Sequence, residues 1–139
     1  MSSWRLSVLA DRHRALGSGL EDWNGMGTAW TYSTHLADEH AAIRTKAGLM
    51  DVSGLKKMHI IGPHAEALIN FATTRNVSKL YPGKSVYACM LNEAGKFIDD
   101  CVIYRNGPNA FMVVHGSGAG HEILTRGAAG RTLVVLPDD

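Results

Sequence analysis

The sequence has few cysteines, no long apolar run and no block of like charge, and each absence excludes a class of protein. Only Cys89 and Cys101 are present among 139 residues, which is too few for a disulfide scaffold and lacks the spacing of a metal site. No apolar stretch approaches the roughly 18 residues that a transmembrane helix requires. Residues 1–9 lack the basic start and apolar core of a secretory signal. These absences favour a reduced, cytoplasmic setting without membrane association.

Charge and composition narrow the class of protein further. The chain has 14 Lys and Arg against 13 Asp and Glu, which gives a net charge of +1. This balance does not indicate a nucleic-acid-binding protein. Hydrophobic residues make up 45% of the sequence, so a chain of this length fits one compact domain with a real core. A small-molecule ligand is compatible with this composition.

Two further patterns argue against a metal or phosphate site. The seven histidines show no HxH, HExxH or Cys/His spacing, and we therefore predict no metal centre. The glycine-rich residues 116–120 match neither full nucleotide-binding motif, so a flexible strand-to-helix turn is the better interpretation.

Hydrophobic periodicity predicts an α+β fold. We expect an antiparallel or mixed sheet that contains a β-meander, with two or three packed helices. A helix over residues 36–47 would be capped by Ser33 or Thr34 and bury Leu36, Ile43 and Ala47. A second helix follows Gly62-Pro63, and a third covers residues 121–126. Strands are predicted at residues 49–52, 57–61, 85–91, 96–105, 110–115 and 132–136.

Asp99 and Asp100 lie in the middle of the strand predicted for residues 96–105. Aspartate is disfavoured in strands, and two in succession point to opposite faces of a sheet. One carboxylate then faces a less solvated side, where it costs several kcal/mol unless it is paired. An edge strand, with one solvated aspartate and one bonded to a turn or the backbone, would explain the pair without a function.

The register of the preceding hairpin bears on this choice. A two-residue loop at Glu93-Ala94 would place Tyr87 opposite Asp100. Ile98, Val102 and Tyr104 would then share a face with Cys89 and Leu91, which gives one carboxylate in an apolar, tyrosine-edged surface suited to an aromatic heterocycle. If Gly95 forms a bulge in a three-residue loop, the parity changes and this pairing fails.

Three segments, in order, resemble the glycine-cleavage T-protein family of aminomethyltransferases. The first is similar to the family's "EH…R…aGlfDvSh" pattern and runs from Glu39 to Ser53. The second, from Ile61 to Ala65, resembles its "G-x-x-A" before a helix. The third, from Tyr87 to Asp100, resembles its "Y-x-x-mlNe-x-GgilDD" stretch. The resemblance covers nearly the whole chain from about residue 9, so residues 1–139 are expected to be the N-terminal segment of an aminomethyltransferase-type folate-binding domain.

The resemblance implies a tetrahydrofolate-dependent transfer of a one-carbon unit, aminomethyl or methyl. Asp100 falls on the family's catalytic carboxylate, which would orient the folate and stabilise positive charge as the donor amine leaves. Tyr87, Val102 and Tyr104 fall on positions that line the folate and donor site. Leu55 falls where many members have a methionine.

The sequence departs from the family pattern near the donor pocket. Gly54 replaces the histidine of "DVSH", and His115 replaces an asparagine of "VVNA" that contacts the site. Trp23-Asn24-Gly25-Met26 also differs from the usual "W-E-M-P". The carbon donor therefore stays open: besides glycine cleavage, a relative that acts on a methylated amine, ether or sulfonium, or an oxidase-associated folate domain, would share this segment.

Family members are more than twice as long, and their later portions supply further folate-binding groups. A site shared between segments is not preorganised by one of them, so the isolated chain is expected to bind folate weakly and to be inactive. The expected partners are a small one-carbon donor and a carrier protein or complementary chain that completes the site. Alternatives are a non-catalytic folate-binding module and one subunit of a split folate-binding protein.

Overall fold

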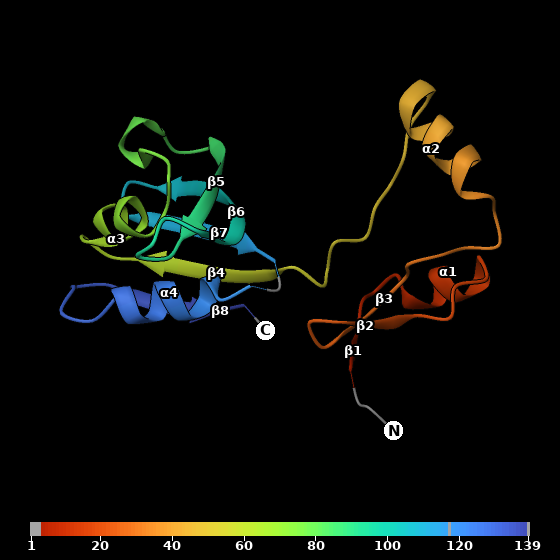
Figure 1. Ribbon diagram of the computed structural model, residues 1–139, viewed down its shortest axis with the longest axis horizontal. Helices are drawn as coiled ribbons and strands as arrows, with labels where there is room; N and C mark the ends of the chain where they lie inside the picture. The colour runs from red at the N-terminus through yellow and green to blue at the C-terminus, as the bar shows by residue number, and fades with distance from the viewer. Residues whose placement is uncertain (1–3, 117, 139) are drawn as a thin grey trace. The chain divides into compact units, whose positions relative to one another are not determined.

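The computed structural model describes residues 4–116 and 118–138, whose contacts divide into two compact units (Figure 1). The N-terminal unit ends at Gly54, and the C-terminal unit begins at Leu55. Length and composition predicted a single compact domain, whereas the structure has two centres of contact. None of the helices in the described ranges has the length and apolar character that crossing a bilayer requires.

The N-terminal unit contains a small sheet and two helices. Strands β2 and β3 form an antiparallel hairpin, and β1 pairs with β3 in parallel. Asn24 and Gly25 have positive φ angles of 55° and 77°, which the tight Asn-Gly turn between β2 and β3 requires. The elements are β1 (Arg5–Leu6), α1 (Ala10–Ala15), β2 (Glu21–Trp23), β3 (Met26–Thr28) and α2 (Leu36–Thr45).

The helix predicted for residues 36–47 is confirmed as α2, but two of its expected features are wrong. The cap is His35, whose Nδ1 accepts a hydrogen bond from the Ala37 amide, rather than Ser33 or Thr34. The helix has no buried residue, and Leu36 and Ile43 are 63% and 55% exposed. Helical spacing identifies the apolar side of a helix, but it does not show whether this stretch of chain covers that side. The strand predicted for residues 49–52 is also absent, since this described segment is irregular.

The C-terminal unit is built on a five-stranded antiparallel sheet in the order β5-β6-β7-β4-β8. Consecutive strands β5, β6 and β7 form the predicted meander, which confirms the α+β class (Figure 1). The elements are β4 (Lys56–Ile61), α3 (Ala65–Ala72), the 3-10 helix η1 (Val77–Lys79), β5 (Ser85–Leu91), β6 (Phe97–Gly107), β7 (Ala110–His115), α4 (Gly120–Gly127) and β8 (Val134–Pro137).

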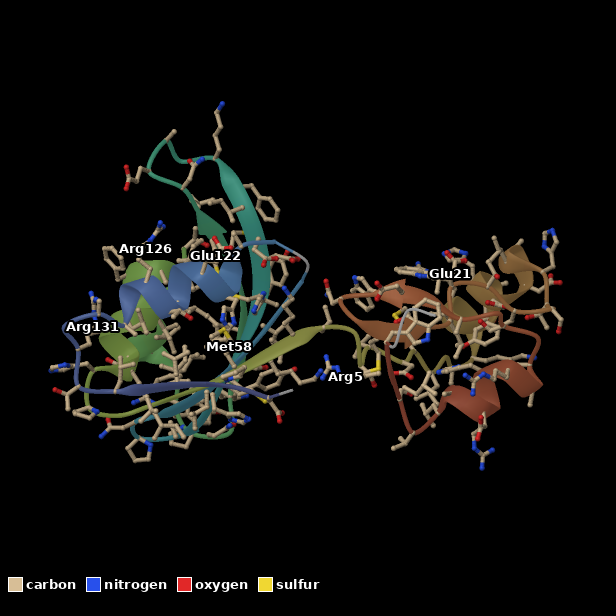
Figure 2. All side chains as sticks on the ribbon, turned by 90° about the horizontal axis from the view of Figure 1, so that it is seen from below. Arg5, Glu21, Met58, Glu122, Arg126 and Arg131 are labelled. Carbon is tan, nitrogen blue, oxygen red and sulfur yellow. The ribbon has the colours of Figure 1, made fainter. Side chains whose placement is uncertain are left out.

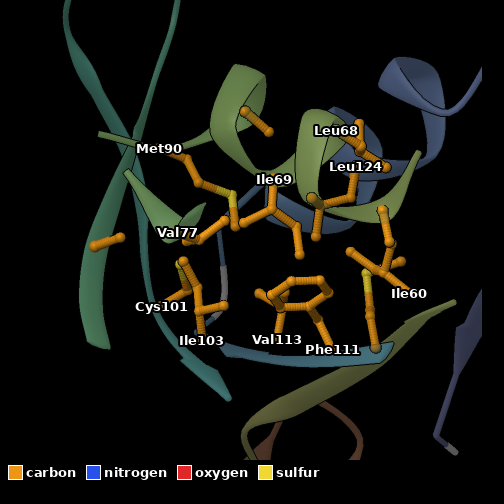
Figure 3. Packing of buried hydrophobic residues seen from close by; sticks show 14 residues of the cluster. Ile60, Leu68, Ile69, Val77, Met90, Cys101, Ile103, Phe111, Val113 and Leu124 are labelled. Atoms are coloured by element: carbon orange, nitrogen blue, oxygen red, sulfur yellow. The ribbon is translucent and has the colours of Figure 1, made fainter. Parts of the chain in front are cut away.

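Helices α3 and α4 supply the apolar side chains that cover the core face of this sheet (Figure 3). Helix α3 buries four residues at helical spacing, as the sequence predicted: Ala65, Leu68, Ile69 and Ala72. They pack with Leu124 of α4 and with the inward residues of the strands, which include Phe111 and Val113. Met58 of β4 points into the same interior, whereas Glu122 and Arg126 of α4 are exposed (Figure 2). The alternation of inward and outward residues therefore leaves one sheet face packed against the helices and the other free of them.

Two phenylalanines on adjacent strands give a matched test of this core. Phe111 is fully buried in the cluster, whereas Phe97 is 63% exposed. Phe111→Ala is expected to lower the free energy of unfolding by about 3–5 kcal/mol, because a buried ring leaves a cavity. Phe97→Ala should change it by less than about 0.5 kcal/mol, as is usual for a surface position. Urea denaturation measures both values, and equal losses would contradict the packing described.

Candidate functional site

The β5–β6 hairpin brings Tyr87 and Asp100 together, although not by the predicted pairing. Tyr87 lies opposite Val102, and Asp100 lies opposite Cys89, so the predicted Tyr87–Asp100 register is wrong by two residues. The two side chains meet diagonally: the Tyr87 hydroxyl donates a hydrogen bond to Asp100 Oδ2 at 2.7 Å. Diagonal neighbours on one sheet face are within reach of a long aromatic side chain.

Two irregularities in the hairpin explain the register. Gly95 has a φ of 73°, and Leu91 pairs with Phe97 around the loop, as in the three-residue alternative. The register then shifts between Leu91 and Met90, which makes Ile98 an extra residue on β6. The bulge at Ile98 restores the in-and-out alternation that the three-residue loop had reversed. Asp100 therefore keeps the face that the two-residue loop predicted.

The bulge at Ile98 contradicts one part of the predicted Asp100 face. Ile98 was expected to lie beside Asp100, but it lines a cavity with Phe71 of α3 and Ile123 of α4. A bulged residue departs from strict alternation, so its side chain cannot be placed from the periodicity alone.

The face that carries Asp100 is open and partly aromatic. Asp100 and Val102 are half-buried, while Tyr87 and Tyr104 are 55% and 38% exposed. Strand pairing places Tyr104 opposite Ser85 and Val102 opposite Tyr87, so these side chains extend along one stripe with Asp100. The structure thus brings four of the six predicted site residues to one surface.

Electrostatics fix the roles of the Tyr87–Asp100 pair. The hydrogen bond to Asp100, together with burial and the nearby negative charge, raises the pKa of Tyr87 to about 12. Tyr87 is therefore a protonated donor at ordinary pH, and Asp100 Oδ2 is its acceptor. This contact orients the carboxylate of Asp100 on the open face.

Gly116 leaves space beside that carboxylate. A Cβ at this position would lie 3.8 Å from Asp100 Oδ1 and 3.2 Å from Asp99 Oδ1. When the β6–β7 and β4–β7 registers are continued by one residue, Gly116 falls between Asp100 and Leu55. Leu55, which is half-buried and precedes β4, thereby belongs to the same row of the sheet.

The structure places His115, the sixth predicted residue, on the opposite face from Asp100. His115 is 1% exposed, lies opposite buried Cys101, and its Nδ1 lies 3.0 Å from Asp99 Oδ2. Burial lowers the pKa of His115, although the hydrogen bond and charge of Asp99 act against this shift. The ring is therefore neutral, with Nδ1 assigned as the donor because its partner is a carboxylate.

Asp99 is a structural carboxylate whose partners the sequence did not reveal. Its Oδ1 accepts hydrogen bonds from the amides of Asp100 and Gly116, and its Oδ2 accepts one from the Gly120 amide. A Cβ at Gly120 would lie 2.8 Å from Asp99 Oδ2, so only glycine fits at the start of α4. Gly116 and Gly120 therefore both donate to one carboxylate between the end of β7 and the start of α4, whereas residue 117 of the predicted strand-to-helix turn lies outside the described residues.

A second polar cluster, in the N-terminal unit, centres on Asp51. Asp51 Oδ2 accepts hydrogen bonds from Ser7 and from His13 Nε2, and its Oδ1 accepts one from the Ser53 amide. The other ring nitrogen of His13, Nδ1, lies 2.8 Å from the Tyr32 hydroxyl. Burial alone would raise the pKa of Asp51, but the hydrogen bonds from Ser53, Ser7 and His13 outweigh it and hold the pKa far below its ordinary value. The Asp51-Val52-Ser53 motif thus anchors irregular backbone.

Neither Cys101 nor a cluster of metal ligands adds a second reactive centre in the described ranges. Cys101 is buried, and burial raises the pKa of its thiol to about 12, which keeps it protonated and inert. Within residues 4–116 and 118–138, His, Cys, Asp and Glu form no group of three or more that could hold a metal ion.

The open β5–β6 face and its carboxylate can be compared with known proteins. A model of the "GCVT N-terminal domain" matches residues 9–128, and the chain therefore belongs to this family. The chain is 72% identical over 138 residues to the heme-dependent oxidative N-demethylase gamma subunit of Ectopseudomonas mendocina (strain ymp), a match that covers 99% of this chain and 37% of that protein.

Aminomethyltransferases are more distant relatives. The enzyme of Bordetella avium (strain 197N) is 37% identical over 118 residues, which are 84% of this chain and 32% of that enzyme. The crystal structure of glycine cleavage system aminomethyltransferase T from Bartonella henselae superposes with a TM-score of 0.84 at 28% identity, covering 97% of this chain and 38% of that one. The chain spans about a third of the length of the curated relatives that it matches.

The buried His115–Asp99 pair predicts a pH-dependent stability. Because the pKa of His115 is lowered below its ordinary 6.5, the unfolded state binds more protons than the folded state in acid. The free energy of unfolding should therefore fall as the pH drops below about 6.5. His115→Asn keeps an amide donor for Asp99 but cannot titrate.

Urea denaturation at pH 7.5 and 5.5 measures this effect. The wild type should lose more stability between the two pH values than His115→Asn does. An identical pH dependence in both proteins would contradict a neutral, buried His115.

Proposed function

We propose that this chain carries the catalytic-carboxylate part of a site for tetrahydrofolate-dependent one-carbon transfer. The observation that supports the proposal is the hydrogen bond from Tyr87 to Asp100 on an open, partly aromatic sheet face. In this reading, residues 1–139 are the N-terminal segment of an aminomethyltransferase-type folate-binding domain. Membership of the family makes tetrahydrofolate the cofactor to test first.

The residues on this face fit a reduced pterin. Val102 and the rings of Tyr87 and Tyr104 offer apolar surface for a flat heterocycle, and Gly116 leaves room beside Asp100 Oδ1. Tetrahydrofolate, when bound, supplies the amine nitrogens that accept the one-carbon unit. Asp100 would accept a hydrogen bond from the folate and stabilise positive charge that develops on a reacting nitrogen. Tyr87 would hold the carboxylate in that orientation.

We propose an N-methylated amine as the carbon donor. The 72% identical relative is named an oxidative N-demethylase gamma subunit. A heme-dependent oxidant outside this chain, as that relative's name records, would take two electrons from the N-methyl group, and hydrolysis of the C–N bond would then release the amine and carbon at the oxidation level of formaldehyde. Condensation of that carbon with an amine expels water and needs no further oxidant. The face that carries Asp100 would then capture the carbon rather than oxidise the amine.

Glycine cleavage is the second candidate donor reaction. Aminomethyltransferases at 35–37% identity favour it, as does the fold match to a glycine-cleavage T-protein. The lower identity ranks it behind demethylation. A non-catalytic folate-binding module would keep the same fold, but would not need the Tyr87–Asp100 contact.

We further propose that a complementary polypeptide completes the site in the cytoplasm. The relatives are about three times as long as their match to this chain, and one of them is named as a subunit. The face around Asp100 is open rather than enclosed, so further groups are needed to bury a folate.

The isolated 139-residue chain should accordingly bind tetrahydrofolate only weakly. Isothermal titration of the chain with tetrahydrofolate measures this directly. We expect a dissociation constant above about 10 μM, because few contacts offset the cost of immobilising the ligand. Submicromolar binding would show that the site is already complete.

In a complete protein that contains this segment, Asp100→Asn should reduce turnover by at least about 100-fold, a typical loss for a missing acid–base group. Tyr87→Phe should cost about 10-fold, the equivalent of one hydrogen bond to a charged group. Asp138→Asn and Tyr81→Phe alter exposed residues of the same types and should leave the rate unchanged. Wild-type turnover in Asp100→Asn, with its fold intact by circular dichroism, would remove Asp100 from the mechanism.

A further inference from the structure

The helix-covered side of the C-terminal unit contains a cleft that the proposed folate site does not use. It lies between α3, α4 and the β5–β6 hairpin, and its volume is about 760 Å³. This size is within the range of cavities that bind small organic ligands. Because α3 and α4 cover the core face of the sheet, the cleft lies on the other side of the sheet from Asp100. We call it the α3–α4 cleft.

Four large apolar side chains line the cleft. Phe71 of α3 and Leu91 at the end of β5 are 72% and 41% exposed. Ile98 at the start of β6 and Ile123 of α4 are half-buried in the same lining. Both helices and the hairpin therefore present apolar groups to one space. A largely exposed ring such as that of Phe71 is a surface on which a flat apolar group can stack.

Two arginines give the cleft a positively charged end. Arg126 is in the last turn of α4 and Arg131 follows the helix, so both lie at the same end of α4 (Figure 2). The Arg131 guanidinium lies 5.2 Å from the centroid of the Phe71 ring and donates a hydrogen bond to the Gly127 carbonyl. Both contacts hold Arg131 in place without neutralising its charge. Arg131 is therefore a preorganised donor for an anion.

The two arginines have no acidic partner in the part of the chain that the structure describes. The ion pairs within residues 4–116 and 118–138 include neither Arg126 nor Arg131. Glu93 of the hairpin loop also lines the cleft, and its charge offsets one of the two positive charges. Two arginines against one glutamate leave the lining with a net charge of +1. The cleft therefore favours an anion over a cation.

We propose that the α3–α4 cleft binds an aromatic carboxylate. Arg126 and Arg131 would hold the carboxylate, because a planar guanidinium can donate to both of its oxygens. The ring would lie against Phe71, Ile98 and Ile123. A compact anion such as phosphate would leave these apolar side chains exposed, and an uncharged apolar ligand would leave the arginines unpaired. The site is separate from the Asp100 face and does not depend on the proposed function.

The test uses 2-naphthoate as the probe. It is titrated into the isotope-labelled 139-residue chain, and binding is followed by the NMR chemical shifts of the backbone amides. We expect a dissociation constant of about 1 mM or below, the affinity of a ligand of about 13 non-hydrogen atoms at ordinary ligand efficiency. The largest shifts should occur at Phe71, Ile98, Ile123 and Gly127. The uncharged 2-naphthylmethanol should bind at least about 5-fold more weakly, because it lacks the carboxylate.

Matched variants separate the charged part of the cleft from its apolar part. Arg126→Gln should weaken 2-naphthoate by about 5- to 10-fold, through the loss of one charged hydrogen bond, and should not affect 2-naphthylmethanol. Phe71→Ala should weaken both probes by at least about 3-fold, because both lose a stacking surface. Arg44→Gln and Phe97→Ala change exposed residues of the same types outside the cleft and should affect neither probe. All four positions are exposed, so these variants should keep the fold.

Equal affinities for the acid and the alcohol would overturn the proposal, as would an unchanged affinity for 2-naphthoate in Arg126→Gln. Shifts centred on Tyr87 and Val102 would also overturn it, because they would place the probe on the Asp100 face. Self-association of the chain that Phe71→Ala abolishes, without binding of 2-naphthoate, would instead assign the cleft to a second copy. Asp100→Asn should leave the affinity for 2-naphthoate unchanged, which separates this site from the proposed function.

Discussion

The carboxylate of Asp99 connects the end of β7, the start of α4 and the backbone of β6. Its oxygens contact the amides of Asp100, Gly116 and Gly120 and the ring of His115, all at a position that is 3% exposed. A buried carboxylate is tolerated only when such partners replace water. Because successive strand residues point to opposite faces, an inward Asp99 obliges Asp100 to point outward. The buried Asp99 and the outward-facing, half-buried Asp100 are therefore two consequences of one strand register.

The two adjacent aspartates therefore have different roles. Asp99 stabilises the fold by accepting hydrogen bonds from the amides of Gly116 and Gly120, and Gly116 places no side chain beside Asp100 Oδ1. Asp100 faces Tyr87 and the open sheet surface, where a flat ligand has access. His115 belongs to the first of these roles rather than the second, since it packs on the core face with Asp99.

The C-terminal unit was predicted well because its helices and strands bury the residues that their helical or alternating spacing indicates. Leu68 and Ile69 bury the side of α3 that their spacing indicated, and β5, β6 and β7 match the predicted strands closely. The pairing partners of the strand residues were predicted less well, because the bulge at Ile98 leaves no clear mark in the sequence. The shared face of Tyr87 and Asp100 was still correct, because the two irregularities cancel. The anchoring role of Asp99 required knowledge of residues up to 21 positions away.

The N-terminal unit was predicted less well than the C-terminal unit. Leu36 and Ile43 have the spacing of a buried stripe, yet α2 buries none of its residues. Periodicity shows which side of a helix is apolar, but it does not show whether the described chain covers that side. The central claim, that the outward face of β6 receives folate at Asp100, is tested most directly by a crystal structure of a complete protein with tetrahydrofolate. The account predicts a pterin nitrogen within about 3 Å of the Asp100 carboxylate, and a folate bound away from Tyr87 and Asp100 would contradict it.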